Sequence, residues 1–243
     1  PPVTPGPQQS YDLNGPLDST ASVALADSTD RTDVDFGYAA TGVIGDTVWL
    51  DQDSDGVRDA GEPGIPAVTV TLVWGGLDGV IGGANAADDV AFTTVTDTTG
   101  AYLFENLPAG SYSVTVAGLP TGLTSTADPD GAGDSTAVLT LANGASNLAQ
   151  DFGYVGNTGI GDLLWLDFNS DGTPGATEPG LSGIPVTVRH PGFDGVLDTA
   201  DDIITTVVTD AAGRYLVEGL PAGLVRVSYV PADLPAGLIG RSD

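Results

Sequence analysis

Residues 44–51 read IGDTVWLD and residues 160–167 read IGDLLWLD, so one eight-residue pattern occurs twice at an offset of 116. A longer pair follows at an offset of 113, where TDTTGAYLFENLPAG (96–110) matches TDAAGRYLVEGLPAG (209–223). The difference between the two offsets places three extra residues of the first copy between these segments. Self-similarity at a fixed long period is typical of tandem domain arrays.

The motif DFGY marks the end of a repeat, since it occurs at 35–38 and again at 151–154. We therefore predict closing strands of a repeat at 1–38, a complete repeat at 42–154 and a repeat lacking its last strands at 157–243. An incomplete sandwich exposes an open sheet edge, which is costly. Either an adjoining part of a longer array supplies the missing strands, or residues 13–38 of another copy do.

Alternating apolar and polar residues predict strands within each repeat. The predicted strands of the complete repeat are 68–74, 90–96, 101–107, 111–117 and 136–142, with others around Trp49 and Phe152. About seven short strands in such a repeat predict an all-β, Ig-like sandwich. The closing strands of the N-terminal segment are expected at 19–26 and 32–38. The residues expected in the cores are Trp49, Trp165, Tyr102, Tyr215, Phe152 and Phe36.

Composition excludes several classes of function. The formal charge is −27, from 33 acidic and 6 basic residues, so nucleic acid and anionic membrane surfaces are poor partners. Neither Cys nor Lys is present, which excludes thiol and Schiff-base chemistry, and one His leaves little for acid–base catalysis. Residue 1 is not Met, so we expect a processed chain or a fragment, without a membrane-spanning apolar run.

Residues 51–62 read DQDSDGVRDAGE, which has the spacing of an EF-hand calcium loop. Alternate side chains of such a loop converge on one point, and the glycine at position 6 permits the sharp turn. The predicted ligands are Asp51, Asp53, Asp55, the carbonyl of Val57, Asp59 and Glu62.

Residues 167–178 repeat this loop in the second copy. The predicted ligands are Asp167, Asn169, Asp171, the carbonyl of Thr173 and Glu178, with water replacing the acid lost at Gly175. Pro63 and Gly64 directly follow the first loop, so no EF-hand helix can leave it normally. We expect both loops to lie on a β scaffold and to be structural.

A second acidic cluster follows in each copy, where residues 76–89 align with 192–202. Its candidate calcium ligands are Asp78, Asp88, Asp89, Asp194, Asp198, Asp201 and Asp202. Strand-end carboxylates could add to them, namely Asp46, Asp97, Asp162 and Asp210. Bound Ca²⁺ would neutralise these clustered charges. The alternatives are Asx-turns within the loops and a halophilic surface.

One position differs in kind between the copies, because His190 stands where the first copy has Trp74. We interpret His190 as a surface strand residue rather than a catalyst. Trp74 is the aromatic side chain to test for ligand binding.

The chain resembles the calcium-binding B repeats of serine–aspartate repeat (Sdr-type) surface adhesins, which belong to the CnaB-like sandwiches. The motifs that carry the resemblance are IGD-x-x-W-x-D, the D-x-[DN]-x-D-G loop, E-P-G-[IL], T-D-x-x-G-x-Y, L-P-A-G and D-F-G-Y. The resemblance implies tandem β-sandwiches that bind several Ca²⁺ ions and act as a rigid stalk. It transfers the EF-type ligands to Asp51, Asp53, Asp55, Asp59, Glu62, Asp167, Asn169, Asp171 and Glu178. Some CnaB relatives form Lys–Asn isopeptide bonds, which a chain without Lys cannot form.

These observations predict an extracellular structural protein, at the cell surface or secreted as a filament. We expect a calcium-stiffened stalk or filament subunit, joined head-to-tail to copies of itself or to adjacent repeats. Donation of residues 13–38 to residues 157–243 of the next chain would be one way to join them. The alternative is an adhesin segment that binds a glycan or host protein, and an enzyme is not expected.

Overall fold

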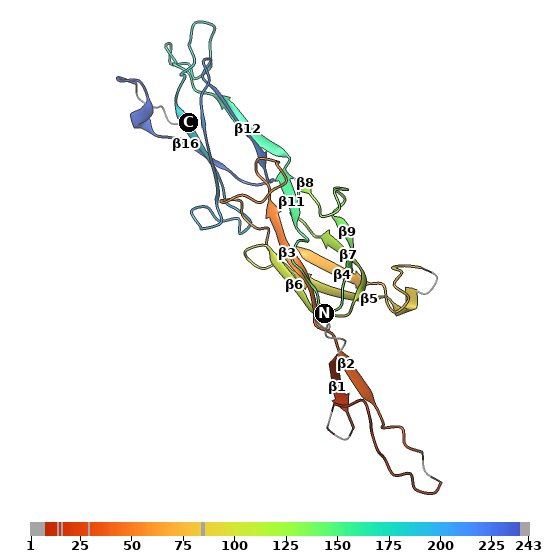
Figure 1. Ribbon diagram of the computed structural model, residues 1–243. Helices are drawn as coiled ribbons and strands as arrows, with labels where there is room; N and C mark the ends of the chain where they lie inside the picture. The colour runs from red at the N-terminus through yellow and green to blue at the C-terminus, as the bar shows by residue number, and fades with distance from the viewer. Residues whose placement is uncertain (1–7, 14, 16, 29, 84–85, 239–243) are drawn as a thin grey trace, which may run out of the picture. The chain divides into compact units, whose positions relative to one another are not determined.

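The computed structural model describes residues 8–13, 15, 17–28, 30–83 and 86–238. Across these residues the regular structure consists of β-strands and two short 3₁₀ turns, η1 (Ala86–Asp88) and η2 (Pro231–Asp233). No helix in this part of the chain is long and apolar enough to cross a membrane. Two compact units divide the chain: one takes its described residues from 1–48, 66–118 and 127–152, the other from 49–65, 119–126 and 153–238. The prediction of an all-β sandwich fold is confirmed (Figure 1).

The first unit holds most strands of the complete repeat. They are β3 (Gly42–Leu50), β4 (Thr69–Trp74), β5 (Val90–Val95), β6 (Ala101–Leu107), β7 (Gly110–Ala117), β9 (Thr136–Leu141) and β10 (Ser146–Asn147). The part of β3 that belongs to this unit ends at Val48. One sheet has the order β5-β4-β7-β9, and all its pairs are antiparallel. In the other sheet, β3 pairs antiparallel with β6 and parallel with β10.

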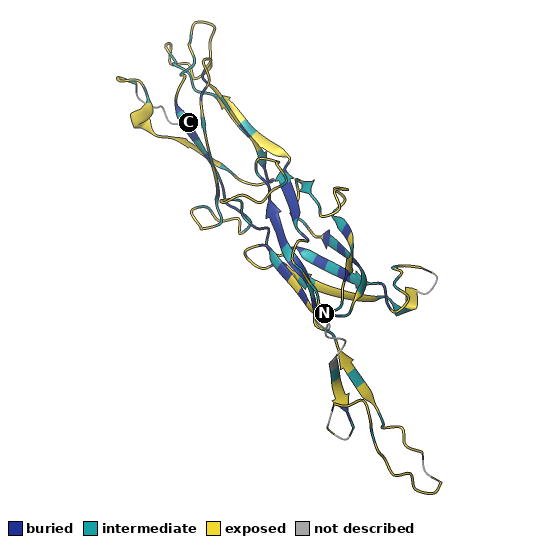
Figure 2. Cartoon of the chain, in the orientation of Figure 1, coloured by how far each residue is buried: buried dark blue, intermediate teal, exposed yellow. Residues whose placement is uncertain are grey.

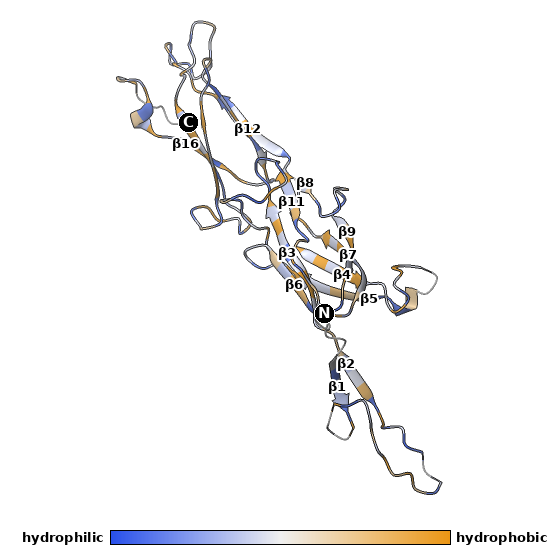
Figure 3. Cartoon of the chain, in the orientation of Figure 1, coloured by the Kyte–Doolittle hydropathy of each residue, from blue (hydrophilic) through white to orange (hydrophobic). Residues whose placement is uncertain are grey.

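Period-two burial fills the space between these sheets, as Figure 2 shows by the alternating dark blue segments. Val70 and Leu72 of β4 point inward, as do Tyr112 and Val114 of β7. The opposite sheet contributes Ile44, together with an edge-to-face pair of Tyr102 and Phe104 whose ring centroids lie 6.1 Å apart. Figure 3 shows the same alternation as hydropathy along the strands.

The second unit contains the matching strands of the next repeat. β12 (Thr158–Leu163) pairs with β15 (Arg214–Leu220), and β13 (Pro185–His190) lies between β14 (Ile203–Val208) and β16 (Arg226–Tyr229). It also contains β8 (Leu123–Ala127), paired with β11 (Phe152–Gly156). Val188, Val217 and Leu220 form the buried cluster between the strands of the second repeat.

The core of the second repeat is more open than that of the first. Trp49 is 2% exposed, whereas its counterpart Trp165 is half-buried. Tyr215 is likewise half-buried, whereas the matching Tyr102 is buried. Trp165 and Tyr215, expected in a core, are therefore only partly covered, because the described residues after β16 form no strands that could bury them further.

The N-terminal segment forms a two-stranded pair, β1 (Gln8–Asp12) with β2 (Phe36–Ala39). This pair corresponds in sequence to β8 and β11, which also pair with each other. Phe36, expected in a core, is instead 40% exposed, and Tyr38 is 57% exposed. Residues 19–26, expected as a strand, lack strand structure because no described residues of the N-terminal segment form an equivalent of β7 to pair with them.

Candidate metal centres

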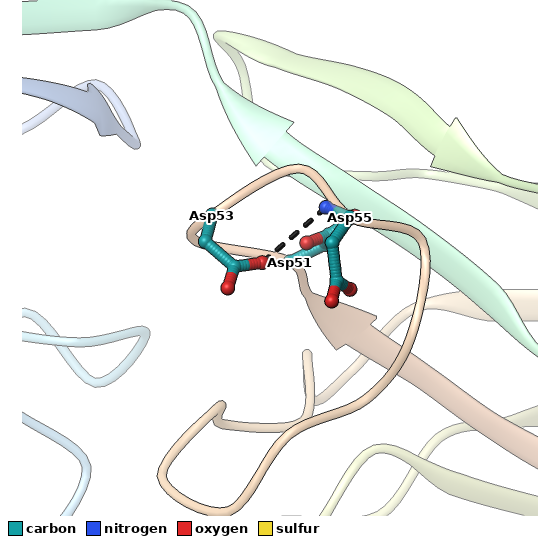
Figure 4. A group of neighbouring side chains, drawn as sticks. All are labelled: Asp51, Asp53 and Asp55. Carbon is teal, nitrogen blue, oxygen red and sulfur yellow. Dashed lines mark hydrogen bonds between the residues drawn. The ribbon is translucent and has the colours of Figure 1, made fainter.

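The first twelve-residue loop brings three carboxylates to one point. Asp51 directly follows β3, and Asp53 and Asp55 follow at alternate positions (Figure 4). One oxygen from each of the three lies within 4.8 Å of the others. Gly56 has a φ of 78°, a left-handed conformation that favours glycine, and its N–H donates to Asp51 Oδ2 at 3.0 Å. The loop is thus closed by the residue that the EF-hand pattern requires.

Asp51 carries the strongest indication of a bound cation. Its side chain is fully buried, and Oδ1 is a buried acceptor without a hydrogen-bond partner. A buried unpaired carboxylate oxygen is costly unless a cation or donor satisfies it. Three converging carboxylates also match the oxygen donors that calcium prefers. The donor set therefore fits Ca²⁺.

Glu62 closes the first loop through the backbone. Its Oε1 accepts from Gln52 N–H at 2.7 Å and its Oε2 from Asp59 N–H at 3.0 Å. Both carboxylate oxygens are therefore engaged without an ion. Val57 and Asp59 are both exposed, and neither side chain belongs to the converging group.

The second loop, at residues 167–178, also brings three acids together, at loop positions 1, 5 and 12 rather than 1, 3 and 5. Asp167, Asp171 and Glu178 each offer an oxygen within 4.8 Å of the others. Gly172 has a φ of 76°, and its N–H donates to Asp167 Oδ2 at 3.1 Å. The loop therefore closes in the same way as the first.

Two residues of the predicted ligand set of the second loop, Asn169 and Thr173, also hydrogen-bond to Asp171. Asn169 Nδ2 donates to Asp171 Oδ2 at 2.9 Å, and Thr173 Oγ1 donates to Asp171 Oδ1 at 2.8 Å. Hydrogen bonds from the Thr173 backbone and hydroxyl lower the pKa of Asp171. Asp171 is therefore held as the carboxylate that a cation needs.

The second acidic cluster of the first repeat organises its own loop. Asp88 Oδ2 accepts from Leu77 N–H at 2.9 Å, and Asp78 Oδ1 accepts from Val80 N–H at 2.9 Å. Asp89 Oδ2 accepts from Gly82 N–H, but its Oδ1 is buried without a partner. Among the described residues, these acids do not converge within 4.8 Å as the two twelve-residue loops do.

The equivalent cluster of the second repeat contains the same backbone contacts. Asp201 Oδ2 accepts from Phe193 N–H at 2.9 Å, as Asp88 does in the first repeat, and Asp194 Oδ1 accepts from Val196 N–H at 2.7 Å. Asp198 and Asp202, however, contact arginine side chains. Asx-type hydrogen bonding, the alternative considered for this cluster, thus accounts for part of the acid content.

Asp46 and Asp151 form a pair that the sequence pattern only half indicated. Thr47 Oγ1 donates to Asp46 Oδ1 at 2.9 Å and lies 3.0 Å from Asp151 Oδ1. Burial, together with the nearby Asp46 carboxylate, raises the pKa of Asp151. The signal for Asp151 was its place as the first residue of the DFGY motif. Asp97 and Asp210 instead cap hairpin turns, accepting from Ala101 N–H and Arg214 N–H.

His190 and Trp74 occupy matching places, but the prediction that His190 is a surface residue is wrong. His190 is only 3% exposed, because period-two burial places it on the inner face of β13. Burial lowers its pKa, although the Ala222 backbone and the Asp202 charge act in the opposite direction. Trp74 is half-buried, and a Cβ at Gly110 would lie 2.5 Å from its Nε1. Each of the two side chains lies directly against a glycine, Trp74 against Gly110 and His190 against Gly223.

Comparison with known proteins gives consistent matches. The family model described as "SdrD B-like domain" matches residues 42–154 and again 158–239. Serine-aspartate repeat-containing protein F of Staphylococcus epidermidis is 34% identical over 90% of this chain and 12% of its own length. Serine-aspartate repeat-containing protein D of Staphylococcus aureus (strain MW2) is 31% identical over 97% of this chain and 16% of its own. The chain thus spans a small part of these relatives.

Solved structures align more distantly. The Bacillus anthracis TIE protein aligns with a TM-score of 0.40 and 14% identity, over 84% of this chain and 30% of that one. The shaft pilin SpaA from Lactobacillus rhamnosus GG aligns with a TM-score of 0.34 and 13% identity, over 82% and 89%.

Proposed function

The chain belongs to the SdrD B-like domain family, and from this premise we propose that its sandwiches form a calcium-stiffened stalk or filament segment. Its location is extracellular, at the cell surface or in a secreted structure. The observation that carries the proposal is that the same twelve-residue loop brings three acids together in each of two successive repeats. A structural role requires the site in every repeat, whereas a catalytic site has no need of duplication.

Bound calcium would crosslink the acidic side chains within each loop and so stabilise the loop. The loop and its flanking residues are closed by hydrogen bonds alone, such as Leu50 N–H to Pro63 O at 2.9 Å and Gly56 N–H to Asp51 Oδ2 at 3.0 Å. With neither Cys nor Lys, the chain has no disulfide or lysine crosslink to restrain these loops. A bound divalent ion would offset the repulsion among the acids and reduce the freedom of the loop.

We further propose that a closing segment with the DFGY motif completes the second repeat. A hollow of about 400 Å³ there is lined by Gly161, Asp162, Asp210, Arg214, Tyr215 and Leu216. In the first repeat, residues that match this lining or directly adjoin it contact the closing segment instead. Gln150 N–H donates to Gly45 O at 3.4 Å, Tyr102 Oη donates to Gln150 O at 2.5 Å, and Asp151 Oδ1 accepts from Thr47 N–H.

Residues 34–38 of another copy supply the same segment. They match 150–154 in sequence, with Asp35 in place of Asp151 and Phe36 in place of Phe152. Phe36 and Tyr38 are exposed where they stand and are therefore available to be buried. The sequence alone leaves a second source open, an adjoining repeat of a longer array, and the experiment below distinguishes the two.

Sedimentation velocity of the full chain, in calcium and then in excess chelator, tests both parts of the proposal. We expect concentration-dependent oligomers in calcium that shorten or loosen in chelator. Tyr38→Asp should abolish the oligomers without unfolding the chain, and Val138→Asp, at a comparably exposed position of β9, should not. A monomer at every concentration would refute completion between copies and favour an adjoining repeat. Identical behaviour in calcium and in chelator would refute the metal staple.

An adhesive role has less support from the geometry. The aromatic side chain chosen to test it, Trp74, is half-buried against Gly110 rather than displayed on the surface. Loss of a surface ligand on Trp74→Ala, with folding intact, would be the result that favours the adhesin alternative.

A further inference from the structure

Arg214 lies at the edge of the second repeat that corresponds to the place where the first repeat receives its closing segment. It lines the hollow of about 400 Å³ beside β12 and β15, and it is exposed. No salt bridge joins Arg214 to an acid within the part of the chain that the structure describes. A guanidinium group is therefore presented at an open edge of a strongly acidic protein.

The first repeat has an uncharged residue at this position. Strand register places Arg214 opposite Leu163 in the second repeat. The same register places Ala101 opposite Thr47 in the first. Directly opposite residues of antiparallel strands carry their side chains on the same face of the sheet. Arg214 therefore starts beside the place where the first repeat has the Thr47 hydroxyl.

Thr47 is the residue that holds the carboxylate of the closing segment in the first repeat. Asp151 Oδ1 accepts from Thr47 N–H at 3.2 Å and lies 3.0 Å from Thr47 Oγ1, and Asp151 is half-buried by these contacts. Leu163 offers no hydroxyl at the matching place. In the second repeat, the side-chain group available to a closing carboxylate is thus the guanidinium of Arg214.

The backbone donor of this contact is retained in the second repeat. Residues of an antiparallel strand point their N–H groups alternately toward and away from a given neighbouring strand. Leu164 N–H donates to Gly213 O on the β15 side, so Leu163 N–H points toward the opposite, open edge of β12. A carboxylate that arrives at this edge can therefore contact one N–H and one guanidinium.

A positive charge is needed there because an acid already occupies the site. In the first repeat, burial and the nearby Asp46 carboxylate raise the pKa of Asp151, so the two like charges oppose each other. Asp162 is the counterpart of Asp46, and Asp35 is the counterpart of Asp151. An incoming Asp35 would meet the same repulsion from Asp162, and the opposite charge of Arg214 would offset it.

The two strand edges that would meet are both open. In the first repeat β11 lies between β3 and β8, whereas among the described strands β2 has only β1 as a neighbour and β12 has only β15. Asp35, directly before β2, is exposed. The segment that begins at Asp35 therefore fits the edge of β12 in both hydrogen bonding and charge.

We propose that Arg214 binds Asp35 of another copy of this chain and so selects the closing segment that completes the second repeat. The ion pair also fixes the register of the added strand, since a slip by one residue would turn Phe36 to the opposite face. This inference rests on the proposed completion between copies, and it names the residue pair that gives the contact its specificity.

Sedimentation velocity of the full chain in saturating calcium, over a concentration series at low and at high salt, tests the pair. Arg214→Ala should raise the dissociation constant of the oligomers about tenfold, which is the size of one charge-assisted hydrogen bond. Arg214→Asp should weaken association further, because it adds an acid beside Asp162. Combining it with Asp35→Arg should restore association. High salt should weaken the wild type more than Arg214→Ala.

A matched control separates this pair from a general effect of charge. Arg58→Ala removes the same charge from another exposed position and should leave the dissociation constant unchanged. Circular dichroism establishes that each variant keeps its β-structure. Unchanged association of Arg214→Ala, with no restoration in the exchanged pair, would overturn the inference and leave completion between copies standing. A wild type that stays monomeric at every concentration would overturn completion between copies, and the inference with it.

Discussion

Asp51→Asn is expected to change the sign of its effect on stability when calcium is added. Without metal, Asp51 has a buried oxygen lacking a partner, which costs about 1–3 kcal/mol. Repulsion from Asp53 and Asp55, whose oxygens lie within 4.8 Å, adds roughly 1 kcal/mol each at water-like screening. An amide keeps an oxygen for the Gly56 N–H and offers donors to the neighbouring carboxylates. In chelator the variant should therefore be more stable than the wild type.

Calcium should reverse this order. A site held at one hundred times its dissociation constant stabilises the folded state by about 2.7 kcal/mol. Asp51→Asn removes one negative ligand from the centre of the loop and should forfeit most of that gain. The wild type should then become the more stable protein.

Urea unfolding of the full chain, followed by the fluorescence of Trp49, measures this difference. Trp49 lies two residues before Asp51 and is buried, and a background with Trp74→Phe and Trp165→Phe isolates its signal. Asp27→Asn, an exposed acid outside the loops, serves as the charge-matched control and should have little effect in either condition. If Asp51→Asn shifts stability equally with and without calcium, the loop is an ordinary turn.

Three further predictions concern the two repeats. Acrylamide should quench the half-buried Trp165 more than Trp49, and assembly in calcium should reduce that difference, whereas equal quenching from the start would contradict an open second core. Burial raises the folded-state pKa of Asp151, so in chelator the folded chain binds more protons at this residue than the unfolded chain does. The free energy of unfolding should therefore fall as pH rises from the ordinary Asp pKa through the raised one. Asp151→Asn should remove that slope when unfolding is measured as a function of pH. Leu72→Ala, at a fully buried position, should cost about 2–5 kcal/mol, while Val138→Ala on the exposed face should cost far less in the same urea titration.

The strands and loops were accessible from local sequence. Period-two alternation placed β4, β5, β6, β7 and β9 within about one residue of their observed bounds, because side chains on a strand point alternately to core and solvent. The spacing of the twelve-residue loops anticipated the convergence of Asp51, Asp53 and Asp55, because Gly56 and the backbone hydrogen bonds of the loop act over a few residues. Geometry of this kind depends on residues close together in the sequence, so the local sequence predicts it.

Contacts between residues distant in the sequence decided which segments form strands, which aromatic side chains are buried and which acids form ion pairs. Residues 19–26 have the alternation of a strand but lack the neighbour that β9 finds in β7, so they form none. Phe36 has the same local sequence as Phe152, yet one is exposed and the other buried, because burial depends on what covers the side chain. Arg189 and Arg226 stand far apart in the sequence, and only the register of β13 with β16 brings them together beside Asp198 and Asp202. The sequence by itself determined the repeat, the strand pattern and the spacing of the acidic loops, whereas the tertiary structure decided which acids pair with arginines, since that depends on contacts between strands distant along the chain.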